Sequence, residues 1–141
     1  MHRQEPGAKR RQNSYATPTP VTDGRQVYAV FYDGTVVAVD FSGKPVWKNQ
    51  EVSFYSLHGL GASPVLADGM VIMAFDGSSR EDQATGWKKP WQNAVVLALD
   101  TKDGSVRWKG KRGESRVGHV TPILVSDGTQ LVSAGGDKVQ G

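Results

Sequence analysis

Short runs of Val, Ile, Leu, Tyr and Phe alternate with turn residues along most of the chain, and helical periodicity is nearly absent. The clearest runs read "QVYAVFY", "TVVAVD", "MVIMAF", "AVVLALD" and "TQLVSAG". Such runs, bounded by turn residues, are typical of β-strands. The dipeptide Asp-Gly, which favours tight hairpin turns, occurs six times. The pattern predicts an all-β meander.

The strand pattern repeats along the chain. Pro20, Pro64 and Pro122 head similar segments, and an Asp-Gly turn follows each at nearly the same distance. The proline spacings are 44 and 58 residues, and the difference lies in an insertion of about 15 residues within "FDGSSREDQATGWKKPWQNAVV". Without it, each unit has about 44 residues, the length of a four-stranded propeller blade.

We therefore expect an all-β fold, a partial β-propeller of about two and a half four-stranded antiparallel blades. Residues 1–16 are expected to be disordered or incomplete, and residues 17–141 to form blades at about 17–50, 62–110 and 120–141, the last incomplete. The predicted strands are 18–22, 26–32, 35–40 and 45–49, then 63–67, 70–75, 93–100 and 105–109, then two more strands and the start of another at Lys138. A ten-stranded β-sandwich is the alternative.

A motif closes each of the first two units. It comprises Ala38, Asp40, Gly43 and Trp47 in "AVDFSGKPVW", and Ala98, Asp100, Gly104 and Trp108 in "ALDTKDGSVRW". A calcium loop starting at Asp100 would need oxygen ligands at Lys102 and Gly104 and a glutamate at Lys111, so this hypothesis is weak. A structural role is favoured: Asp caps the turn, Gly takes a left-handed conformation, and Trp covers the junction with the next blade.

This motif, once per blade, resembles the repeat of the pyrroloquinoline-quinone (PQQ)-like β-propellers, and "ASPVLADG" and "VTPILVSDG" look like that family's first strand. The resemblance covers residues 17–141. The family includes PQQ-dependent dehydrogenases and non-enzymatic relatives such as the outer-membrane assembly lipoprotein BamB. The resemblance implies a periplasmic or cell-envelope location, although the given chain carries no signal peptide. It also implies further blades and an upstream end missing from this sequence.

Charge changes the picture little. The formal net charge is +3, and Arg3, Lys9, Arg10 and Arg11 against Glu5 already supply that excess. The remainder balances at 13 basic and 13 acidic residues (17 minus 4, and 14 minus 1). We therefore expect no nucleic-acid partner. No apolar run is long enough to span a bilayer, and the chain has no cysteine.

Two histidines and two tryptophans form a candidate ligand or partner face. His58 and His119 each follow the closing tryptophan of their unit by 11 residues, so both lie in loops that lead to an innermost strand. The insertion, with Trp87 and Trp91, should overhang the same face, and long aromatic loops are favoured binding sites. Alternatively, the histidines bond neighbouring backbone, and the tryptophans fold back over their own blade.

A basic run follows the second closing motif. It comprises Arg107, Lys109, Lys111, Arg112 and Arg116. We expect these charges on an outermost strand and the loop after it, where exposed charge discourages pairing between sheet edges.

Catalysis finds little support in the sequence. There is no phosphate loop, zinc-protease motif or nucleophile elbow, and the calcium ligands, catalytic aspartate and adjacent cysteines of PQQ dehydrogenases cannot be placed. We expect a non-catalytic protein-interaction scaffold, with no cofactor, whose partners are proteins or the remaining blades. Two alternatives stay open: part of a PQQ-dependent alcohol or sugar dehydrogenase, with PQQ and calcium, and a carbohydrate or surface-ligand binder. Exposed faces at the end blades also predict self-association.

Overall fold

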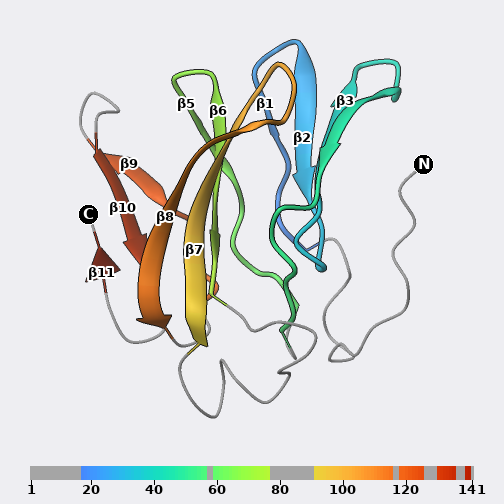
Figure 1. The fold of residues 1–141 in the computed structure, drawn as a ribbon. Helices are drawn as coiled ribbons and strands as arrows, with labels where there is room; N and C mark the ends of the chain where they lie inside the picture. Colours follow the sequence, from blue (N-terminus) through green and yellow to red (C-terminus); the bar gives the residue numbers. More distant parts are fainter. Residues whose placement is uncertain are drawn as a thin grey trace.

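The strands form three antiparallel sheets that stand side by side, as Figure 1 shows for the computed structural model of the chain. The structure describes residues 17–56, 59–76, 91–115, 118–125, 130–135 and 139–140. Each sheet is a meander in which consecutive strands pair. The predicted partial propeller is thereby confirmed, because three sheets stack in succession, with an apolar cluster on each face of the middle one, whereas a sandwich has two sheets around one core.

The first sheet holds four strands in the order of the chain. They are β1 (Val21–Thr22), β2 (Gln26–Val30), β3 (Val36–Asp40) and β4 (Pro45–Asn49). The second sheet repeats this order. Its strands are β5 (Val65–Ala67), β6 (Met70–Phe75), β7 (Trp91–Asp100) and β8 (Val106–Ser115). The third sheet comprises β9 (Ile123–Val125), β10 (Gln130–Ala134) and β11 (Val139–Gln140).

The last hairpin of the second sheet is longer than the sequence predicts. Strand β7 begins at Trp91 instead of residue 93, and β8 continues to Ser115 instead of ending at 109. The pairing register shifts between Trp91 and Ala94 and again between Ala94 and Val95. These β-bulges bend the hairpin and re-aim side chains, and they hide the strand alternation that would have marked the extension in the sequence.

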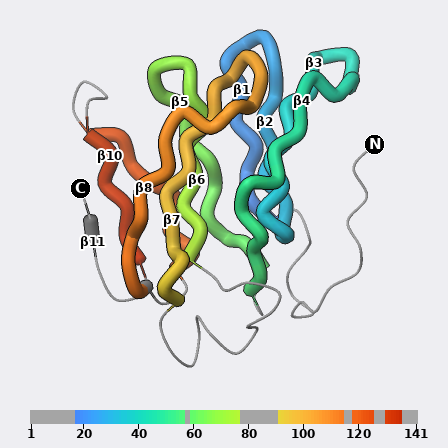
Figure 2. Tube along the Cα trace, in the orientation of Figure 1, coloured from blue at the N-terminus to red at the C-terminus, as the bar shows by residue number. Residues whose placement is uncertain are grey.

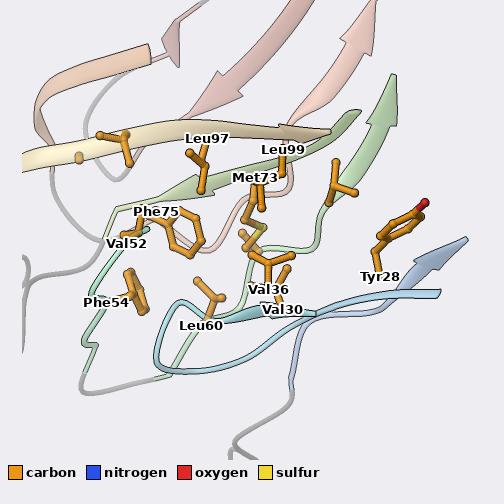
Figure 3. Packing of buried hydrophobic residues seen from close by; sticks show 14 of the residues in the cluster. Tyr28, Val30, Val36, Val52, Phe54, Leu60, Met73, Phe75, Leu97 and Leu99 are labelled. Carbon is orange, nitrogen blue, oxygen red and sulfur yellow. The ribbon is translucent and has the colours of Figure 1, made fainter. Parts of the chain in front are cut away.

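The second sheet is buried on both faces, because successive side chains of a strand point to opposite sides. Phe75, Met73, Leu97 and Leu99 point towards the first sheet, where they meet Val30 and Val36 of that sheet and Leu60 of the connection that follows it (Figure 3). The opposite face carries Ile72, Ala74, Val96 and Ala98, and Leu131 of the third sheet packs against it. Double-sided burial explains why "MVIMAF" and "AVVLAL" are apolar throughout instead of alternating.

The connection between the first two sheets also contributes to the core. Val52, Phe54, Leu60 and Ala62 lie in the segment from β4 to β5, and each is buried. The rings of Phe54 and Phe75 are tilted, with centroids 5.7 Å apart. Described residues of this segment therefore belong to the core between the two sheets.

Candidate functional site

The closing motif of the first sheet forms a capped turn. The Asp40 Oδ1 oxygen accepts hydrogen bonds from the backbone N–H groups of Ser42 and Lys44, each at 2.9 Å. Gly43 adopts a φ of 82°, which disfavours residues with a Cβ. The carboxylate therefore fixes the turn that leads into β4 and carries no other visible role.

Trp47 joins the first sheet to the second. Its indole Nε1 donates a 2.9 Å hydrogen bond to the backbone oxygen of Thr101, in the turn between β7 and β8. The Asn49 side-chain amide donates to the backbone oxygen of Gly104, at 2.8 Å, in the same turn. Figure 2 shows this turn reaching over the first sheet. The tryptophan of one sheet thus docks on the closing turn of the next.

Gly104 is required for this docking. It has a φ of 72°, and a Cβ built on it would lie 2.4 Å from Cε3 of the Trp47 ring. A side chain at this position would displace the indole. The glycine of the repeat therefore serves two purposes, the turn conformation and the close approach of the neighbouring tryptophan.

The other members of the motif are not engaged in the same way. Trp108, the equivalent of Trp47, is 38% exposed. The turn of the first sheet is also open: Phe41 is 68% exposed, and a Cβ on Gly43 would meet nothing within 4 Å among the described residues. Trp108 is therefore a partly exposed tryptophan of the kind that docks at Trp47. The turn around Phe41 and Gly43 is an exposed turn of the kind that receives such a tryptophan.

Hydrogen bonds in these turns lower the pKa of several carboxyl groups. The hydroxyl of Ser42 and the backbone N–H of Lys44 lower the pKa of Asp40, and the backbone N–H of Lys102 and the Arg107 guanidinium lower that of Asp100. Bonds from the hydroxyl and the backbone N–H of Ser105 lower the pKa of Asp103. Each bond favours the ionised carboxylate.

We predict that Asp40→Asn makes the chain less sensitive to acid. A carboxyl whose pKa is lower in the folded chain stabilises it fully above the unfolded value, and this contribution disappears as the pH falls through the folded value. For Asp40 the loss should occur below its ordinary pKa of 3.8. Urea unfolding at pH 6 and pH 3 measures it. Val46→Thr, which removes no carboxyl group at an exposed position of β4, is the control and should keep the acid sensitivity of the parent; equal behaviour of the two variants would contradict the prediction.

Tyr28 lies behind the docked tryptophan. Its ring centroid is 5.9 Å from that of Trp47, and its hydroxyl donates a 2.8 Å hydrogen bond to Asp23 Oδ2. Burial, with the Asp23 carboxylate as a second cause, raises the pKa of Tyr28 to about 12. The hydroxyl therefore stays protonated and acts as a structural donor.

Only part of the predicted ligand face falls within the described residues. His58 and Trp87 lie outside them. His119 is exposed and packs on Gly61: a Cβ built on that glycine would lie 2.9 Å from Cβ and Nδ1 of the histidine. The loops before β5 and β9 are thus in contact, and a histidine occupies the junction.

Trp91 does not lie on that face. It is 6% exposed, at the start of β7, and belongs to the core between the first two sheets with Val52 and Phe54. The prediction that Trp91 lies at the surface is wrong, because the extended hairpin includes the end of the insertion in the sheet. The position of Trp91 agrees with the alternative prediction, in which the tryptophan folds back over its own blade.

A buried ion pair between Asp76 and Arg112 escaped sequence analysis. Both Asp76 carboxylate oxygens lie 2.6 Å from Arg112 Nη1, and each side chain is 2% exposed. Arg112 Nη2 also donates to the backbone oxygen of Ser133 in the third sheet, at 3.3 Å. The pair therefore connects the end of β6, the outer strand β8 and the next sheet.

The prediction that the basic run is exposed is therefore wrong at Arg112. Lys111 pairs with Val95 and Gly113 with Ala94, so Arg112 is the extra residue of a bulge. Arg107 and Lys109 are exposed, and they pair with Asp100 and Glu51. Arg116 lies outside the described residues. Because Arg112 is the bulge residue, strand alternation along β8 could not have assigned its side chain to the buried face.

Within the part of the chain that the structure describes, no three His, Asp or Glu side chains converge as a metal site would require. The same residues include no helix that could span a membrane.

A family model described as outer membrane protein assembly factor BamB matches residues 4–141. Over 122 residues the chain is 29% identical to the outer membrane protein assembly factor BamB of Moranella endobia (strain PCIT), a match that spans 84% of this chain and 24% of that protein. It is 27% identical over 119 residues to a lambda-carrageenase of Pseudoalteromonas carrageenovora, covering 84% of this chain and 11% of the enzyme.

A solved structure shares the fold. A europium-containing methanol dehydrogenase superposes with a TM-score of 0.51 and 18% identity, over 71% of this chain and 15% of that one. The chain thus spans between about a tenth and a quarter of the length of these curated relatives. At this identity the structural likeness concerns the fold alone.

Proposed function

Because the chain belongs to the BamB-like family of PQQ-repeat β-propellers, we propose that it is a non-catalytic scaffold that binds proteins in the bacterial cell envelope. The relative from Moranella endobia is named an assembly factor for outer membrane proteins. A periplasmic site of action and a partner from outer-membrane assembly follow from the same proposal.

The open turn of the first sheet is the observation that carries this proposal. In the second sheet the equivalent turn is covered by Trp47, and Thr101 is only 9% exposed. In the first sheet Phe41 stands in the position of Thr101 and is 68% exposed. Aromatic side chains are enriched at protein interfaces. The turn around Phe41 and Gly43 is therefore a suitable site for an apolar or aromatic side chain of a partner protein.

We predict that a photo-crosslinking amino acid at position 41 captures a component of the outer-membrane assembly machinery. The full chain would be exported to the periplasm of a Gram-negative host and irradiated in living cells. The same amino acid at Lys102, an exposed position of the covered turn, is the matched control and should capture much less. Equal crosslinking at both positions, or none to that machinery, would count against the proposal.

The first competing function is that of a PQQ-dependent dehydrogenase. The superposition with a methanol dehydrogenase gives the fold and no activity at 18% identity. We expect no binding when the full chain is titrated with PQQ and calcium and followed by tryptophan fluorescence. Saturable binding, with dye-linked oxidation of an alcohol or sugar, would favour the enzyme.

Carbohydrate binding is the second competing function. The similarity to a lambda-carrageenase favours it, but one of its two candidate tryptophans, Trp91, is buried in the core. Affinity electrophoresis in a gel containing lambda-carrageenan tests it directly. If the gel retards the parent protein and Trp87→Ala abolishes the retardation, carbohydrate binding would be favoured over the scaffold function.

A further inference from the structure

The Asp-Gly turns of the chain are not held equally, and this difference has a chemical consequence. The backbone nitrogen of a glycine can attack the side-chain carboxyl of a preceding aspartate and close a succinimide ring. Hydrolysis of the ring then gives either aspartate or isoaspartate. Of the six Asp-Gly dipeptides, the structure describes both residues of four, which begin at Asp23, Asp33, Asp68 and Asp103.

Hydrogen bonds hold the carboxylates of three of these aspartates. Each accepts the backbone N–H two residues further along the chain, at 2.8 Å for Asp23 and Asp103 and at 2.9 Å for Asp33. The backbone N–H of Gln26 lowers the pKa of Asp23, and bonds from Ser105 lower the pKa of Asp103. The ring closes from the protonated carboxyl, whose hydroxyl leaves as water, so a bonded and ionised carboxylate reacts slowly.

The attacking nitrogen is held in the same three turns. The Gly24 N–H donates to Thr22 Oγ1 at 3.1 Å, and the N–H groups of Gly34 and Gly104 each donate to a backbone oxygen at 2.9 Å. Gly34 and Gly104 are also buried. Ring closure would break these bonds, so the fold protects both reacting groups in these turns.

The turn of Asp68 and Gly69, between β5 and β6, lacks this protection. Both residues are exposed, and among the described residues neither the Asp68 carboxylate nor the Gly69 N–H forms a hydrogen bond. Asp68 has a φ of 47°, and it is the one described residue other than glycine with a positive φ. This conformation costs energy for a residue with a Cβ, so the strain lowers the cost of leaving the turn conformation for ring closure.

We propose that Asp68 is a site of spontaneous conversion to isoaspartate. A bond forms from the Gly69 nitrogen to Asp68 Cγ, the bond from Cγ to its hydroxyl breaks, and the amide proton leaves with that hydroxyl as water. Water then attacks the backbone carbonyl carbon of Asp68 and opens the ring. The main chain afterwards runs through the side-chain methylene, and the former backbone carbonyl becomes a carboxylate. The net change in composition is zero, and no other reactant is needed.

Isoaspartate at this position would disturb the turn on which Trp47 docks. The Gly69 backbone oxygen accepts a 2.9 Å hydrogen bond from the Thr101 N–H, and the Thr101 oxygen accepts the bond from Trp47 Nε1. Gly69 lies in a two-residue turn, because Ala67 pairs with Met70. An added methylene lengthens this turn and displaces Gly69 from the register that the strands impose. Conversion therefore weakens the contact between the first two sheets.

Ageing of the full chain in water enriched in the heavy oxygen isotope tests the proposal. Mass spectrometry of proteolytic peptides then reports the label at each aspartate that has passed through the ring. In the folded chain Asp68 should gain label at least about tenfold faster than Asp23, Asp33 and Asp103, the protection that one hydrogen bond to a charged group gives. In urea the four rates should become similar, because all four are Asp-Gly dipeptides. Equal rates in the folded chain would overturn the proposal.

Two variants of position 68 provide matched controls. Asp68→Asn closes the same ring with loss of ammonia, which leaves more readily than water, so isoaspartate should accumulate sooner than in the parent. Asp68→Glu keeps the charge but would need a larger ring, so position 68 should stay unlabelled. The aged parent should unfold at a lower urea concentration than the fresh protein, and aged Asp68→Glu should not. A labelled Asp68→Glu, or equal losses of stability in the two aged proteins, would count against the assignment.

This inference is independent of the proposed scaffold function and of any blade outside the given chain. It uses one hairpin turn of the second sheet, which has a described sheet on each side.

Discussion

Replacing Arg112 with methionine is expected to lower the free energy of unfolding by about 3–5 kcal/mol, the usual cost of removing one partner of a buried ion pair. Arg112 and Asp76 are each 2% exposed, and both carboxylate oxygens lie 2.6 Å from Arg112 Nη1. Without the guanidinium, the Asp76 carboxylate is left as a buried charge. Urea unfolding followed by circular dichroism measures the loss.

Two further variants separate the buried charge from general damage to β8. Lys111→Met changes the exposed neighbour of Arg112 and should alter the free energy of unfolding by no more than about 0.5 kcal/mol. The double variant Asp76→Leu with Arg112→Met removes both charges and should recover much of the lost stability. Equal losses for the single variants at 111 and 112 would show that the pair does not stabilise the junction with the third sheet.

Replacing Trp47 with alanine is expected to lower the free energy of unfolding by about 3–5 kcal/mol, the range for removing a buried aromatic side chain. Trp47 is 8% exposed, donates to the Thr101 backbone oxygen and covers Gly104. The variant loses the indole contacts and leaves a cavity between the first two sheets. Thermal and urea unfolding give the measurement.

The repeat supplies a matched control for this variant. Trp108 occupies the same position in the motif but is 38% exposed, so Trp108→Ala should cost only about 1–2 kcal/mol. Gly104→Ala should also destabilise the chain, since its Cβ would meet the indole of Trp47 at 2.4 Å. Similar losses at 47 and 108 would contradict the view that docking on the next turn makes the difference.

Repetition made the fold predictable. Three prolines, their Asp-Gly turns and two copies of the closing motif gave the unit length, the strand order and most strand positions. These features are local, because turn chemistry and alternation depend on residues a few positions apart. The predicted strands at 26–32, 35–40 and 45–49 differ from β2, β3 and β4 by at most two residues.

The candidate site was predicted less well, for a physical reason. Trp91 and Arg112 both lie at bulges of the β7–β8 hairpin, and a bulge reverses the parity by which a sequence assigns side chains to faces. An aromatic residue in a long insertion favoured a surface role, and an arginine in a basic run favoured an exposed one. The structure buries both residues.

The sequence by itself determined that the chain consists of PQQ-type repeats, with an aspartate, a glycine and a tryptophan closing each of two units. The tertiary structure decided what these residues contact: Trp47 docks on a turn 54 residues away, whereas Trp108 stays partly exposed. It also decided that Asp76 meets Arg112. Contacts between sheets depend on how whole blades stack. Strand alternation depends on residues a few positions apart within one blade, so it does not predict which residues meet across two blades.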